Sequence, residues 1–155
     1  MVKVSDEQFQ KLIAVGIDAI PPLYQKHLQN VAFIVEDEPS PEQRRKLNLY
    51  RGELLFGLYE GVPLPQRQGT TKLLPDKITV FKRPAEAISR NINELSEHVR
   101  HTIWHEVAHY YGLDHKRIHE LEKKQLATSN QRLGIRKQAK YQQLDTRTNI
   151  KSKKS

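Results

Sequence analysis

The chain has 155 residues, of which 37% are hydrophobic and 28% are charged, and it contains no cysteine. The lack of cysteine excludes disulfides, thiolate metal ligands and a cysteine nucleophile. The N-terminal residues are too polar for a signal peptide, and no apolar run approaches the ~20 residues that span a bilayer. We therefore expect a cytoplasmic protein that does not act at a membrane. The length favours one folded domain over residues 1–126, followed by a tail over residues 127–155.

The net charge of +8 belongs almost entirely to this tail. Residues 1–124 contain 18 Lys or Arg against 17 Asp or Glu, whereas residues 125–155 contain eight Lys or Arg against Asp145 alone. A nearly neutral body is not expected to hold nucleic acid. The basic tail leaves contact with RNA as a weaker alternative, because Tyr141 is its one aromatic residue for stacking.

The first predicted element is a helix over residues 5–28 with Ser5 as its N-cap. Its apolar residues recur at intervals of three and four: Phe9, Leu12, Ile13, Ile17 and Ile20. Pro21 and Pro22 interrupt this pattern. A second, short helix is expected to start there, because proline is well tolerated in the first turn of a helix.

Three strands are predicted next, over residues 31–35, 54–59 and 77–82. Residues 39–45 (PSPEQRR) form a loop or a short helix before the second strand. The third strand (KITVFK) is expected to stop before Pro84.

A long helix is predicted from about Asn91, with one buried stripe at four-residue spacing: Leu95, Val99, Ile103 and Val107. Gly112 is expected to end it, and a shorter helix should follow from Asp114 to about Leu126. Residues 132–144 are expected to form at most a transient helix within a flexible tail. The predicted fold class is α+β, with a small mixed sheet packed on helices.

The segment HTIWHEVAHYYGLDH, residues 101–115, contains the candidate metal ligands and the candidate general base. His105 and His109 are four residues apart, so their imidazoles project from the same face of a helix and can share one Zn²⁺. Glu106 lies on the flank of that face, where it can act as a general base toward a zinc-activated water.

A catalytic zinc site needs a third protein ligand and leaves the fourth position to water. Gly112 can take the positive φ of a turn, which would let His115 reach back to the metal. The competing interpretation is a helix whose histidines face solvent or form core hydrogen bonds. That interpretation suits His27, His98 and His101, but it does not explain the extended spacing.

The extended motif HEVAHYYGLDH resembles the zinc signature of the metzincin peptidases. A metzincin needs a methionine turn downstream of the third ligand, and Met1 is the one methionine here. The chain is more similar, over residues 5–124, to the minimal zincin-like metallopeptidases. The segments GLYEGVPLPQR, KITVFKRP and HTIWHEVAHYYG carry this resemblance. By analogy with that family, the strand KITVFK would flank the active-site cleft, where an extended substrate could pair with it. In that family the third-ligand position is often acidic, which leaves His115 and its neighbour Asp114 as alternatives.

The predicted function is that of a zinc-dependent metallopeptidase, which hydrolyses peptide bonds in peptide or protein substrates with Glu106 as general base. An amidase or a deacetylase would use the same residues. The alternatives are a non-catalytic zinc-binding or interaction module and an RNA-associated protein that acts through its tail. Glu106 favours the enzyme, because a module that only binds metal needs no base beside its ligands.

Four neighbouring residues have two interpretations each. Tyr110 or Tyr111 could stabilise an oxyanion, although packing is the commoner role for tyrosine beside such a motif. His119 could contact the site, although a surface position is favoured. Asp114 could support a ligand imidazole, but capping of the following helix is favoured.

Overall fold

The computed structural model of the chain describes residues 1–66 and 75–129. The chain divides into two compact units. The first combines Met1–Pro39 with Leu54–Gly112, and the second combines Ser40–Glu53 with the chain from Leu113 onward. The predicted domain boundary after residue 126 stays a prediction. The tail helix expected at 132–144 lies outside the described residues.

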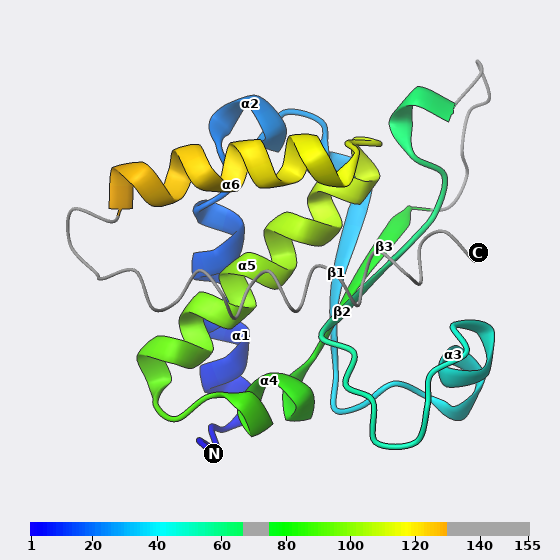
Figure 1. Cartoon of the computed structure of the whole chain (residues 1–155), viewed down its shortest axis with the longest axis vertical. Helices are drawn as coiled ribbons and strands as arrows, with labels where there is room; N and C mark the ends of the chain where they lie inside the picture. The colour runs from blue at the N-terminus through cyan, green and yellow to red at the C-terminus, as the bar shows by residue number, and fades with distance from the viewer. Residues whose placement is uncertain (67–74, 130–155) are drawn as a thin grey trace. The chain divides into compact units, whose positions relative to one another are not determined.

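The first unit begins with α1 (Asp6–Asp18), which starts where the sequence predicts (Figure 1). Ser5 and Gln8 form a capping box, in which each side chain accepts the backbone N–H of the other residue. The helix then stops at the two prolines, and a short α2 (Pro22–Gln25) follows, as expected. A 3-10 turn, Leu28–Asn30, leads into the sheet.

The sheet has three strands in the order β1-β3-β2, and it is mixed, as predicted. The central strand β3 (Asp76–Phe81) runs parallel to β1 (Val31–Glu36) and antiparallel to β2 (Gly57–Glu60). The observed β2 is shorter than the predicted strand over residues 54–59. Of the expected segment, only the part from Gly57 onward lies in the ladder.

The expectation that an extended substrate pairs with KITVFK is wrong, because β3 is the central strand and both of its edges are occupied. The edge strand on the α5 side is β2. The backbone N–H of Phe81 donates to Phe56 O, and antiparallel pairing alternates by one residue, so Leu58 faces β3 and Tyr59 directs its backbone groups away from it. A substrate could therefore extend the sheet on this side only at β2.

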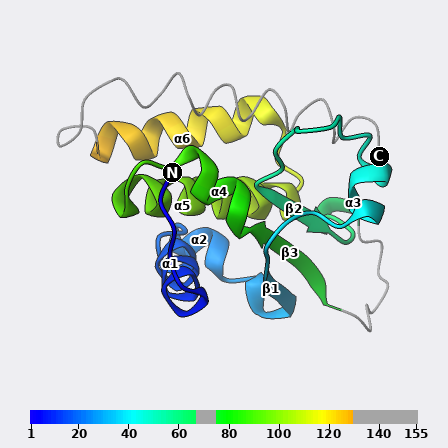
Figure 2. The ribbon, with the colours of Figure 1, turned by 90° about the horizontal axis from the view of Figure 1, so that it is seen from below.

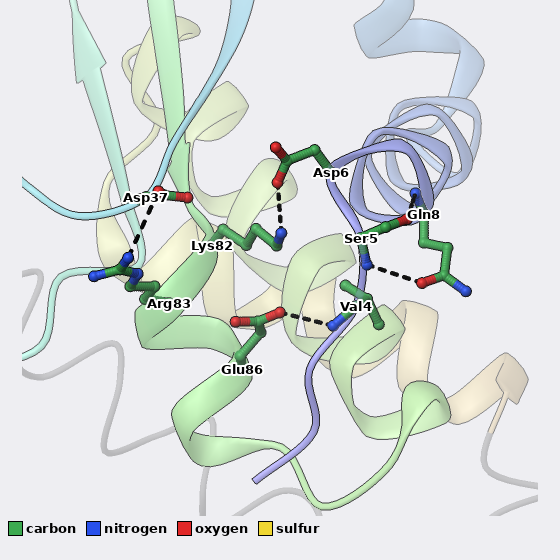
Figure 3. Close-up of polar contacts among 8 residues, drawn as sticks. All are labelled: Val4, Ser5, Asp6, Gln8, Asp37, Lys82, Arg83 and Glu86. Atoms are coloured by element: carbon green, nitrogen blue, oxygen red, sulfur yellow. Dashed lines mark hydrogen bonds and ion pairs between the residues drawn. The ribbon is translucent and has the colours of Figure 1, made fainter.

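A helix that the sequence did not predict, α4 (Lys82–Ile88), follows β3 directly. Pro84 does not act as a stop signal, because it lies in the first turn, where a missing N–H costs no helical hydrogen bond. α4 anchors the N-terminal segment (Figure 3). The Lys82 ammonium lies 2.6 Å from the Asp6 carboxylate, and Glu86 Oε1 accepts the Val4 N–H at 2.9 Å.

The long helix α5 (Ile92–Tyr110) starts at Asn91, whose side chain accepts the Glu94 N–H. All four residues of the predicted stripe are fully buried: Leu95, Val99, Ile103 and Val107. α5 packs against α1, α4, β2 and β3, so it is the central element of this unit (Figures 1 and 2). Among the described residues, no helix combines the length and apolar character needed to cross a bilayer.

The second unit contains α3 (Pro41–Lys46) and α6 (His115–Ser129). Ser40 and Gln43 form a second capping box at the start of α3, which confirms a short helix over PSPEQRR. The Arg44 guanidinium donates to Tyr50 O and closes the following turn. At the start of α6, Asp114 Oδ1 accepts the Arg117 N–H.

The two carboxylates that hold the N-terminal segment should differ in their effect on stability. Glu86 is 7% exposed and accepts a backbone N–H, whereas the Asp6 side chain is 90% exposed. Glu86→Ala should lower the free energy of unfolding by about 1–3 kcal/mol, because it leaves the Val4 N–H without this acceptor. Asp6→Ala should lower it by less, about 1 kcal/mol or below, because water screens the Asp6 end of its ion pair with the nearly buried Lys82. Urea unfolding of both variants checks this order, and equal losses would contradict it.

Candidate functional site

The C-terminal half of α5 brings three of the predicted site residues together. His105 and Glu106 are each 4% exposed, and His109 is half-buried. The Nε2 atoms of His105 and His109 lie 3.1 Å apart, with ring centroids at 4.7 Å. The two imidazoles therefore converge through the same ring atom. One carboxylate oxygen of Glu106 and one nitrogen of each ring lie within 4.8 Å of one another.

This geometry fits a metal ion of the zinc type. Two nitrogens held at 2.0–2.1 Å from a tetrahedral ion lie roughly 3.3–3.4 Å apart. The observed separation of 3.1 Å between the two Nε2 atoms is close to that value, so a small rotation of either side chain is enough to accommodate the ion. Imidazole nitrogen is also the donor that zinc accepts together with water and carboxylate oxygen. The donor set therefore agrees with the chemistry predicted from HExxH.

Glu106 is held by the edge strand. Its Oε2 accepts the backbone N–H of Tyr59 at 2.9 Å. The close approach requires glycine at position 57, because an added Cβ would lie 2.6 Å from Thr102 Cγ2 and 3.0 Å from Glu106 Cγ. β2 therefore sets the position of the predicted base on α5.

Gly112 ends α5 in the predicted conformation. Its φ of +70° lies in the left-handed region, and its N–H donates to His109 O. The position has a second constraint, because a Cβ on Gly112 would lie 2.8 Å from Pro65 Cγ. Glycine is thus needed both for the turn and for the packing of Pro65 against it.

The remaining metal-ligand candidates belong to the second unit. His115 is the first residue of α6, directly after the turn at Gly112, and its role as third ligand stays a prediction. Asp114 caps α6 through the Arg117 N–H, which is the role that the sequence favoured. His119 Nδ1 lies 3.9 Å from Glu122 Oε2 within the same helix.

Tyr110 and Tyr111 have packing roles. The Tyr110 hydroxyl donates to His27 O, and the Tyr111 hydroxyl donates to Tyr24 O. Burial raises the pKa of Tyr111 above its ordinary value, so this phenol stays protonated at neutral pH. These bonds direct both hydroxyls toward the α2 region, which is a structural use.

His98 also has a structural role, as the sequence indicated. Its Nδ1 lies 2.8 Å from Ser89 Oγ, and both residues are buried. Since the Ser89 hydroxyl donates its one proton to Ala85 O, the hydrogen between Ser89 and His98 must come from Nδ1. His101 lies one turn before His105, with ring centroids 6.3 Å apart.

Sequence reasoning missed the residues that support the base. Gly57 and Tyr59 lie in the segment GLYEG, which the family resemblance singled out without assigning a role. No local spacing connects this segment with Glu106, because the Tyr59–Glu106 contact joins residues 47 positions apart. Thr102 was likewise unassigned, although it lies one turn before Glu106 on α5.

The comparison with known families identifies the family of the chain. A family model described as zincin-like metallopeptidase matches residues 28–125, which is more than half of the chain. The chain therefore belongs to the zincin-like metallopeptidase family, and the α+β fold predicted from the sequence is confirmed. No curated protein matches the chain.

The energetic cost of replacing Gly112 can be compared with the cost at Gly52, a second glycine with a positive φ. Gly52 has φ +80° and no atom within 4 Å of an added Cβ, whereas a Cβ on Gly112 would meet Pro65. Gly52→Ala should lower the free energy of unfolding by about 1–2 kcal/mol through the left-handed conformation alone. Gly112→Ala should cost about 1–3 kcal/mol more, through overpacking. Thermal and urea unfolding compare the two variants. Equal losses in the free energy of unfolding would show that Pro65 moves aside without an energetic cost.

Proposed function

We propose that the protein is a zinc-dependent metallopeptidase that hydrolyses peptide bonds in peptide or protein substrates. The observation that carries the proposal is the convergence of the two Nε2 atoms, 3.1 Å apart, next to the carboxylate of Glu106. Membership of the zincin-like metallopeptidase family supports the same conclusion. A cytoplasmic location stays a prediction from the sequence.

His105 and His109 would hold the metal through Nε2. Zinc, when bound, supplies a Lewis acid that polarises water and the substrate carbonyl. Glu106 takes a proton from the attacking water and returns it to the leaving amine nitrogen. The Tyr59 N–H donates to Glu106 Oε2 and so orients the carboxylate for this exchange. Burial of His105 and Glu106 limits competing hydrogen bonds from bulk water.

His115 is the proposed third ligand, and the use of Asp114 supports this choice. The Asp114 carboxylate accepts the Arg117 N–H at the start of α6, so the acidic alternative already has a structural task. His115 follows the left-handed turn at Gly112 by three residues, which is the spacing of the extended zinc motif.

Glu106→Gln should abolish cleavage without removing the metal. The amide keeps the size of the side chain but cannot take a proton, so turnover of a fluorogenic peptide library should fall by about 10²–10⁴-fold. Zinc content, measured by atomic emission, should stay near one ion per chain. Glu97→Gln is the matched control, because it makes the same change on α5 at a residue that pairs with Arg100. The control should keep both activity and zinc.

The outcome also separates the enzyme from a non-catalytic module. Stoichiometric zinc with no cleavage by the wild type or by either variant would contradict the peptidase and favour a module that binds metal. Cleavage that persists in Glu106→Gln would contradict the role of the base. Loss of wild-type cleavage on treatment with a chelator, and its return with added zinc, would support the metal-dependent reaction.

The choice between His115 and Asp114 can be tested by zinc affinity. His115→Ala should weaken zinc binding by at least about tenfold, because two imidazoles alone leave the ion incompletely ligated. Asp114→Ala should leave zinc affinity unchanged and lower stability by about 0.5–2 kcal/mol through loss of the helix cap. Competition with a zinc-chelating dye measures the first effect, and thermal unfolding measures the second. The reverse pattern would identify Asp114 as the ligand.

A further inference from the structure

Tyr59 connects two buried carboxylates, those of Glu106 and Asp76. Its backbone N–H donates to Glu106 Oε2 at 2.9 Å, and its hydroxyl donates to Asp76 Oδ2 at 2.6 Å. Asp76 is the first residue of β3 and is 0% exposed. Asp76 has no role in the proposed chemistry, yet Tyr59 links it to the base through these two hydrogen bonds.

The surroundings of Asp76 hold its carboxylate against this end of β2. Gly61 lies so close that an added Cβ would be 2.5 Å from Asp76 Cγ and Oδ1. Glu60 pairs with Lys77 in the ladder, next to the contact of Tyr59 with Asp76. A short hydrogen bond from a phenol to a buried carboxylate is strong, because the acceptor is charged and water is excluded.

The opposite side of Tyr59 is fixed by α5. The rings of Tyr59 and Tyr110 meet edge to face with centroids 6.0 Å apart. The Tyr110 hydroxyl is in turn bonded to His27 O. The Tyr59 ring is therefore held between a helix residue and a strand carboxylate, which limits the rotation of its backbone at the edge of the sheet.

We propose that Asp76 and Tyr59 are positioning residues for the general base: Asp76 fixes the Tyr59 side chain, and Tyr59 thereby holds its backbone N–H on Glu106. The inference deepens the proposed function and rests on it for the role of Glu106. Neither residue is catalytic, since they act through Glu106. The Tyr59 N–H confines the Glu106 carboxylate to one orientation.

Hydrogen exchange at the residue 59 amide tests this link without any substrate. In Tyr59→Phe, measured by NMR on the full chain with added zinc, this amide should exchange about tenfold faster or more than in the wild type. The buried Val99 amide of α5 should not change. Asp76→Asn should largely keep the slow exchange, because its amide oxygen can still accept the hydroxyl.

Tyr111→Phe is the matched control, since it removes another tyrosine hydroxyl that donates to an oxygen, here Tyr24 O. It should leave exchange at residue 59 unchanged. Wild-type exchange at this amide in Tyr59→Phe would overturn the proposal, as would equal acceleration in Tyr111→Phe. Either result stands whether or not the protein cleaves peptides, so it is separate from a failure of the proposed function.

Cleavage of the fluorogenic peptides gives the second measurement. Tyr59→Phe should lower kcat by about tenfold with KM and zinc content unchanged, because an effect through the base acts on the chemical step. The losses of kcat caused by Tyr59→Phe and by Glu106→Gln should not be additive. In the Glu106→Gln background, Tyr59→Phe should cause little further loss of kcat. Equal loss in both backgrounds would show that Tyr59 acts independently of Glu106 and would overturn the positioning role.

Discussion

The close approach of β2 to α5 is the constraint on which the site depends. At Gly57 there is no room for a side chain between the strand and Thr102 of the helix. This contact lets the next-but-one residue, Tyr59, place its N–H on Glu106. The same helix buries its apolar stripe, Leu95 to Val107, in the core, so α5 cannot move away from the strand without opening that core. The base is therefore fixed by the packing of the whole unit.

The parts of the fold with local causes could be predicted from the sequence. The four-residue spacing of α5 defines its buried stripe, and that stripe is fully buried. Ser5 begins α1, and Gly112 ends α5, because each residue type suits a particular backbone conformation. The pairing of His105 with His109 follows from helical geometry alone, which is why the motif could be interpreted before any contact was known.

The parts that depend on long-range packing could not be predicted. The order of strands in a sheet is set by contacts between distant segments, so nothing within KITVFK distinguishes the central strand from one that borders a cleft. α4 was missed because a proline in a first turn has the same appearance in sequence as a proline that stops a strand. Tyr59 could not be connected with Glu106 or Asp76, since hydrogen bonds across the fold leave no periodic pattern.

The outward-facing N–H of Tyr59 has a consequence for any peptide that lengthens the sheet at β2. A peptide strand added at this edge would direct a carbonyl oxygen toward the Tyr59 N–H, but that N–H already donates to Glu106. The two acceptors are therefore mutually exclusive at that atom. A polypeptide that pairs with β2 while the base stays in position must therefore leave the Tyr59 N–H to Glu106. The hydrogen bond that positions the base thus removes one donor from the edge of β2 that a substrate strand would otherwise use.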